Sequence, residues 1–149
     1  MRFTRFASVV IAFVFTQHSM AQNFYAKHWA DSVFNSLTDD ERIAQLLVVR
    51  SSGMGADGSP VIYESRVDSL VAQYNIGAIC AFQGSPVDHA NMFNHMQALA
   101  KTPVMITVDA EWGLGMRFAG VKGFPYQLTM GALNDAALVY KVGTAIGEQ

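Results

Sequence analysis

Two carboxylates, an aromatic ring and an arginine follow directly after a strongly apolar run of the chain. The run covers residues 103–108, and the residues after it include Asp109, Glu111, Trp112 and Arg117. A β-branched apolar run of this kind is typical of a buried parallel strand. In parallel sheets and α/β barrels, ligands bind at the carboxyl ends of the strands. The sequence therefore predicts a ligand site immediately after this strand.

The spacing of the two acids allows more than one chemistry. If the strand geometry continues, Asp109 and Glu111 point to the same side with their roots roughly 6.6 Å apart, a separation close to that of the acid pair in a glycosidase. Two acids on one strand approach a sugar from the same direction, however, whereas catalysis must address the leaving oxygen and the anomeric carbon separately. Binding of sugar hydroxyls is the better use, since a carboxylate accepts two such hydrogen bonds strongly.

The neighbouring residues fit the same interpretation and also a plainer one. Arg117 can donate to a ligand or hold a carboxylate in place, and Trp112 can stack on a sugar face or pack beneath the loop. The alternative is a capped loop with an internal ion pair between an acid and Arg117 and no ligand.

The elements that must position this loop alternate along the chain. Helical spacing of apolar residues and capping signals predict the helices, and short β-branched runs predict the strands. The expected elements are a helix over 23–37, a helix opened by the capping box Thr38–Glu41, a strand at 48–49, a loop over 51–60, a helix over 61–74, a strand over 76–82, a helix starting at Pro86, a strand over 103–108, and a last helix from Asn134–Asp135 that still runs at Gln149.

This alternation predicts right-handed βαβ units and a parallel sheet. We expect about three βα units, whereas a complete eight-stranded barrel takes roughly 250 residues. The fold class is therefore α/β, the N-terminal portion of a TIM-type (β/α)8 barrel. A self-contained three- or four-stranded α/β domain is the alternative.

The first residues resemble a secretory signal sequence. Arg2 and Arg5 precede an apolar run over 6–15, and small residues stand at Ser19 and Ala21. That pattern predicts a signal peptide over 1–21 with cleavage after Ala21, and a domain over 22–149. The apolar run is about half of the roughly 20 residues that span a bilayer. We expect a secreted or periplasmic protein with no membrane attachment after cleavage. A retained anchor and an unstructured start are the alternatives.

Composition excludes several classes of partner. The formal net charge is −2 over 149 residues, which gives no basic excess for nucleic acid. His89 and His95 are six residues apart and point in different directions on a helix, so they cannot share a metal. We expect no metal and no cofactor. Cys80 is expected to be a buried, inert thiol, and Gly53, Gly55 and Gly58 a flexible glycine-rich loop rather than a dinucleotide-binding turn.

The loop after the third strand is similar to the signature of glycoside hydrolase family 3. That family has an Asp-x-Glu-Gly-Gly-x-x-x-Arg-like loop followed by Phe-Pro, which Asp109, Glu111, Gly113 and Arg117 match, with Phe124–Pro125 after them. The similarity covers most of 37–149, including Gln45–Leu46, the strand with Ile76–Gly77–Ala78, Asn94 and Gln97. Residues 111–115, Glu-Trp-Gly-Leu-Gly, depart from the commoner form and resemble exported bacterial members, mostly β-N-acetylglucosaminidases.

The resemblance implies a function and a division of labour. It implies a retaining hydrolase that releases terminal β-linked N-acetylglucosamine, with an aspartate nucleophile and an acid/base in segments that this chain does not contain. No catalytic residue is therefore expected among these residues, and the chain as given is expected to be an inactive fragment. Asp109 and Arg117 would bind substrate, with Glu111 bracing the loop. The alternatives are a β-glucosidase of the same family, a non-catalytic carbohydrate-binding fragment, and a small exported scaffold that binds a protein.

Overall fold

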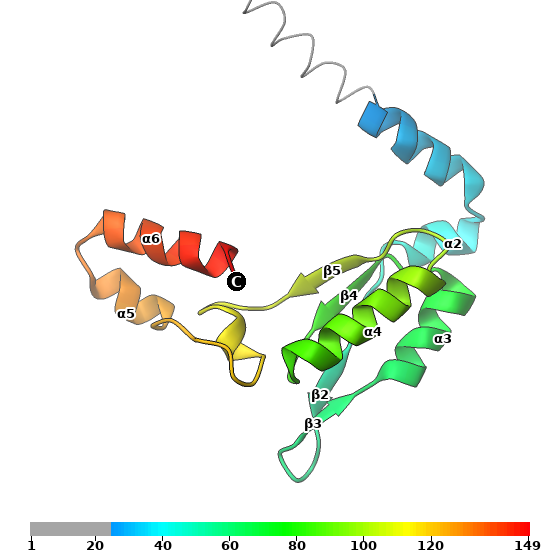
Figure 1. The fold of residues 1–149 in the computed structure, drawn as a ribbon. Coiled ribbons are helices and arrows are strands. Elements are labelled where there is room, and N and C mark those ends of the chain that lie inside the picture. The colour runs from blue at the N-terminus through cyan, green and yellow to red at the C-terminus, as the bar shows by residue number, and fades with distance from the viewer. Residues whose placement is uncertain (1–24) are drawn as a thin grey trace, which may run out of the picture. The chain divides into compact units, whose positions relative to one another are not determined.

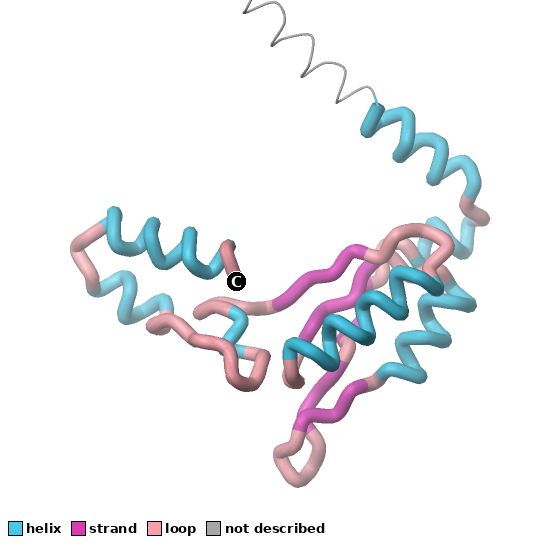
Figure 2. The backbone as a smooth tube through the Cα atoms, in the orientation of Figure 1, coloured by secondary structure: helices cyan, strands magenta, loops and turns pink. Residues whose placement is uncertain are grey.

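The computed structural model describes residues 25–149, and the predicted signal sequence lies outside the described residues. The chain divides into two compact units, with the boundary in the sequence between Arg42 and Ile43. Each unit is described by itself. Figure 1 shows the helices and strands, and Figure 2 shows the same backbone by type of secondary structure.

The described part of the first unit is a helix followed by the capped start of a second helix. Residues 25–36 are helical, as predicted, although Trp29 and Phe34 are exposed and only Leu37, just after the helix, is buried. Helix α2 (Asp39–Ala44) begins with the predicted capping box. The Thr38 backbone N–H donates to the Glu41 carboxylate at 2.8 Å, and the Glu41 N–H donates to the Thr38 hydroxyl at 3.3 Å. These two bonds satisfy donors that a helix start leaves open.

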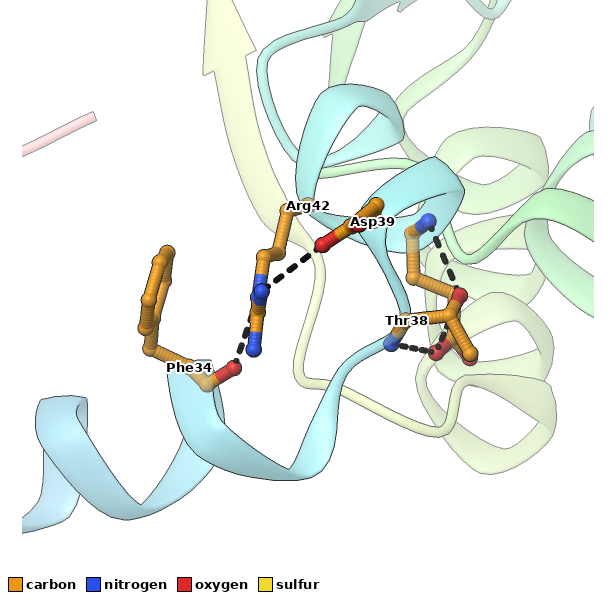
Figure 3. A network of polar contacts seen from close by, with 5 residues as sticks. Phe34, Thr38, Asp39 and Arg42 are labelled. Carbon is orange, nitrogen blue, oxygen red and sulfur yellow. Dashed lines mark hydrogen bonds and ion pairs between the residues drawn. The ribbon is translucent and has the colours of Figure 1, made fainter.

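Arg42 joins the two helices of this unit (Figure 3). Its Nη1 lies 2.8 Å from Asp39 Oδ1, its Nε donates to the Phe34 carbonyl at 3.1 Å, and its guanidinium lies over the Phe34 ring at 4.3 Å. The exposed Phe34 ring therefore contacts a cation and is not packed in an apolar core.

The second unit is built on a parallel three-stranded sheet with two helices on one face (Figure 1). The strand order is β1–β4–β5, so the three predicted strands are confirmed and lie in chain order. The sheet and its helices are β1 (Val48–Arg50), α3 (Glu64–Tyr74), β4 (Ala78–Ala81), α4 (Pro86–Leu99) and β5 (Met105–Val108).

The core lies between this sheet and helices α3 and α4. Val67 and Val71 of α3 and Met92 and Met96 of α4 are almost fully buried against Ile79 of β4. In register, Ile79 pairs with Val49 of β1 and Ile106 of β5, so these three residues share the helix-covered face. On the opposite face, Val48 and Met105 are more than half exposed. One face of the sheet is thus packed and the other open.

Residues 51–62 correct the prediction of a loop. Strands β2 (Ser52–Met54) and β3 (Pro60–Ile62) pair in antiparallel register as a β-hairpin. The predicted glycine-rich loop is therefore paired on both sides, and only its turn is irregular. Glycine and proline weaken strand propensity, which is why the pattern indicated a loop, but the ladder between Ser52 and Ile62 overrides it. Helix α3 consequently starts at Glu64 and not at Val61.

The segment after β5 contains short elements. They are the 3-10 turn η1 (Leu114–Met116), α5 (Gln127–Ala132) and α6 (Ala136–Gly147). The predicted start of the last helix is confirmed, since Asp135 accepts a hydrogen bond from the Leu138 N–H at 3.0 Å. The prediction that this helix runs to Gln149 was wrong, because helical structure ends at Gly147. Within residues 25–149, none of the helices has the length and apolar character needed to cross a membrane.

Candidate functional site

Each of the three strands of the sheet has a polar or aromatic residue at its carboxyl end. Arg50 is the last residue of β1, Phe82 directly follows β4, and Asp109 directly follows β5. Because the strands are parallel, their carboxyl ends meet at one edge. The loop that bears the predicted site therefore lies beside residues from both neighbouring strands.

Asp109 and Arg117 contact each other in this loop. Arg117 Nη2 lies 2.5 Å from Asp109 Oδ2, and Arg117 Nε donates to the Asp109 carbonyl at 2.9 Å. The arginine side chain is 12% exposed and that of the aspartate 48% exposed. The guanidinium thus holds the aspartate by one bond to its carboxylate and one to its backbone carbonyl, and about half of the aspartate side chain stays open to a ligand.

The ring of Phe82 joins this pair to the end of β1. The guanidinium carbon of Arg117 lies 4.4 Å from the ring centroid, and that of Arg50 lies 4.9 Å from it. Arg50 is itself held by donation from its Nε to the Ser52 carbonyl at 2.9 Å. Cation–π contacts of this kind hold guanidinium groups in place, so the row Arg50–Phe82–Arg117–Asp109 is continuous across the three strand ends.

Trp112 and Glu111 lie on the other side of the loop. The Trp112 ring meets Tyr126 edge to face at 4.6 Å, and its carbonyl accepts the Phe124 N–H at 2.8 Å. Of the two roles predicted for Trp112, packing within the loop is the one seen. The Glu111 side chain is exposed, and its carbonyl accepts from the side chain of Gln127. Ligand binding by either residue stays a prediction.

A pocket of about 580 Å³ opens next to this row. Arg50, Tyr63, Arg66 and Phe82 contribute to its wall together with apolar residues of β1 and α3. Asp109 and Glu111 are exposed and do not line this pocket. The structure therefore places the predicted acids at the carboxyl end of β5 and outside the lining of this pocket.

The structure also shows where the other residues considered in the sequence analysis lie. Cys80 is half-buried in β4, less covered than predicted. His95 is exposed and lies 3.2 Å from Asp68, whereas His89 is buried. Among residues 25–149, no cluster of three or more histidine, cysteine or acidic side chains is arranged to bind a metal.

Comparison with known proteins now gives the family. Residues 38–149 match the family model described as the glycosyl hydrolase family 3 N terminal domain, which is well over half of the chain. No curated protein matches the chain.

The chain belongs to glycosyl hydrolase family 3. The three-stranded parallel sheet with its helices is part of the TIM-type N-terminal domain of that family, as the sequence predicted. The domain is that of a glycosidase, and its substrates are carbohydrates.

Two residues of this candidate site, Arg50 and Phe82, were not predicted from the sequence. Arg50 and Phe82 stand at the carboxyl ends of predicted strands, as Asp109 does. Applying the same strand-end rule to all three strands would have found them. Their contact with Arg117, in contrast, depends on strand order and register, which spacing along the chain does not give.

Proposed function

We propose that this chain forms part of the substrate cleft of a retaining β-N-acetylhexosaminidase, with Asp109 and Arg117 as the residues that bind the terminal sugar. The observation that carries the proposal is the Asp109–Arg117 pair at the end of β5, fixed by two bonds and half exposed on the carboxylate side. A half-exposed carboxylate can accept hydrogen bonds from hydroxyl groups, whereas it contributes little to a hydrophobic core.

The choice of sugar follows from the loop between the two residues. The form Glu-Trp-Gly-Leu-Gly at 111–115 resembles that of exported bacterial members of the family, mostly β-N-acetylglucosaminidases, and this resemblance favours N-acetylglucosamine over glucose. Glu111 braces the loop through its carbonyl, and Trp112 forms its floor against Tyr126. Neither the nucleophile nor the acid/base is assigned to a residue of this chain.

The place of action is part of the same proposal. A signal peptide over 1–21 would deliver the domain 22–149 to the periplasm or the medium. Mass determination of the mature N-terminus would test this, since a start at Gln22 is expected.

The proposed function is tested by the Asp109→Asn substitution in the protein that the native gene encodes. The unsubstituted protein should hydrolyse an aryl N-acetyl-β-glucosaminide faster than the matching β-glucoside. The substitution removes a charged acceptor, and charge-assisted hydrogen bonds are worth about 1.5–3 kcal/mol each, so kcat/KM should fall about tenfold or more.

Asp40→Asn serves as the matched control, because Asp40 is an exposed aspartate in the first turn of α2. It should leave kcat/KM unchanged. Equal kcat/KM for Asp109→Asn and the unsubstituted enzyme would refute the binding role, and faster cleavage of the β-glucoside would refute the choice of sugar.

A further inference from the structure

The histidine at position 89 is a buried polar side chain that the proposed function does not use. It lies in the first turn of α4 and is 2% exposed. Its Nδ1 is 3.1 Å from the Ser85 carbonyl, and its Nε2 is 3.2 Å from the Ser51 hydroxyl and 3.5 Å from that of Ser52. Ser51 and Ser52 are themselves fully buried.

For an imidazole with a single N–H, these contacts decide which ring nitrogen carries the proton. A carbonyl oxygen only accepts, so Nδ1 must donate to Ser85, and Nε2 is then the acceptor for the Ser51 hydroxyl. The ring thus joins the residue after β1 to the N-cap of α4 by two directed bonds. Buried polar groups need such partners, because losing one leaves the other unsatisfied.

The same ring also contacts the loop after β5 through Phe118. The His89 ring lies 4.8 Å from the Phe118 ring and 5.4 Å from the Phe93 ring. Gly84 lies directly against it, since a Cβ there would come within 2.4 Å of His89 Cε1. Gly84 also bonds to the loop after β5, donating to the Arg117 carbonyl at 3.3 Å and accepting from the Ala119 N–H at 3.0 Å.

Three residues that contact His89 lie one or two positions from a member of the candidate site. Ser51 follows Arg50, and Phe118 follows Arg117. Gly84 lies two residues after Phe82. The imidazole therefore touches the three strand-end loops that carry the row Arg50–Phe82–Arg117–Asp109.

We propose that His89 is the positioning residue of this site: its two hydrogen bonds and its ring set the relative places of the loops after β1, β4 and β5, so that both guanidinium groups reach Phe82 and Arg117 reaches Asp109. The expected effect on hydrolysis rests on the proposed function, whereas the expected effect on the geometry of the loops does not. A residue that merely fills space would be replaceable by any ring of similar size.

The test compares His89→Phe with His95→Phe in the protein that the native gene encodes. Phenylalanine keeps a ring but has no hydrogen-bonding nitrogen. His95 is on the same helix, is exposed, and lies outside the site, so it controls for the loss of a histidine. His89→Gln keeps a donor and an acceptor and serves as the conservative variant.

The first readout is the Arg117 Nε–H signal in nuclear magnetic resonance, assigned by its loss in Arg117→Lys. It reports the bond to the Asp109 carbonyl directly. His89→Phe should move this signal and speed its exchange with water, His89→Gln should largely restore it, and His95→Phe should leave it unchanged.

The second readout is hydrolysis of an aryl N-acetyl-β-glucosaminide. We expect kcat/KM to fall about tenfold in His89→Phe, as for the loss of a buried hydrogen bond, and to recover in His89→Gln. If His89→Phe does not fold, Ser51→Ala removes the same Nε2 bond with a smaller change and should move the Arg117 signal in the same direction.

A folded His89→Phe, or Ser51→Ala in its place, with an unchanged Arg117 signal and unchanged kcat/KM would overturn the proposal. An unsubstituted protein that cleaves no glycoside would instead refute the proposed function, and the resonance measurement would still decide whether His89 positions the loops.

Discussion

Two loops leave the same edge of the sheet and are held in different ways. The hairpin loop, residues 51–63 after β1, contains β2 and β3, and its turn is closed by bonds from Gly55 N–H to the Ser59 carbonyl at 2.7 Å and from Gly58 N–H to the Gly55 carbonyl at 3.0 Å. The acidic loop, residues 109–126 after β5, has no such ladder. It is held by hydrogen bonds within the loop, such as that from the Phe124 N–H to the Trp112 carbonyl, and by bonds to Gly84, Gln127 and Gln149 outside it.

The difference shows where the site obtains its rigidity. The turn of the hairpin loop is determined by five neighbouring residues, so changes elsewhere should leave its shape intact. The acidic loop instead brings backbone segments that are farther apart in the chain into close contact, such as Gly115 against Lys122 and Gly123. Changes to close packing in the acidic loop should therefore cost more stability than changes to turn chemistry in the hairpin loop.

The largest loss of stability is expected from Gly115→Ala in the acidic loop. A Cβ at position 115 would come within 2.5 Å of Gly123 N and 2.7 Å of the Lys122 carbonyl carbon, both of them backbone atoms that cannot rotate away. Overpacking costs about 1–3 kcal/mol, and we expect the upper part of that range in the free energy of unfolding because the contacts are with backbone, together with a displaced Arg117 Nε–H signal. Urea unfolding followed by circular dichroism measures the first.

Gly143→Ala is the control, because a Cβ at position 143 of α6 meets no atom within 4 Å. Alanine favours a helix over glycine by about 0.5–1 kcal/mol, so this variant should be neutral or stabilising. A Gly115→Ala variant as stable as Gly143→Ala would contradict the idea that close packing fixes the acidic loop.

A smaller effect is expected from Gly58→Ala in the hairpin loop. Gly58 has φ +79° and open space around its Cα, so the whole cost is that of the left-handed backbone. That cost is about 1–2 kcal/mol for a residue with a Cβ. Gly58→Asn should lose less, since asparagine tolerates this conformation. Unfolding by urea checks both variants, and a loss in Gly58→Ala exceeding that in Gly115→Ala would reverse the comparison.

The smallest effect is a pH dependence of the hairpin turn. Hydrogen bonds from the Ser59 hydroxyl and then from the Ser59 N–H lower the pKa of Asp57 below its ordinary value. Because the folded-state pKa is the lower one, this contribution to stability is present above the unfolded-state pKa and is lost as pH falls through the folded-state pKa.

The Ser59 amide signal, followed by nuclear magnetic resonance during acid titration, should report this change at a pH below the ordinary aspartate range. In Asp57→Asn the change should disappear. A midpoint at the ordinary value for aspartate would show that the turn does not hold the carboxylate.

The features that were predicted correctly from the sequence depend on interactions between neighbouring residues. Ser85 accepts the Asp88 N–H at 3.1 Å with Pro86 in the first turn of α4, so the start of that helix follows from adjacent residues. The hairpin was missed because Gly53 and Pro60 have poor strand propensity, and α5 was missed because its six residues show no apolar periodicity that a short helix could display.

The sequence by itself determined the βα alternation, the family and the placing of Asp109 and Arg117 after a parallel strand, because caps, periodicity and motif spacing involve residues close together in the chain. Only the tertiary structure decided that Arg50 and Arg117 share the ring of Phe82 and that His89 touches all three loops. Those contacts join residues from three strand ends, and the order and register of the strands, set by burial of the sheet against α3 and α4, bring them together.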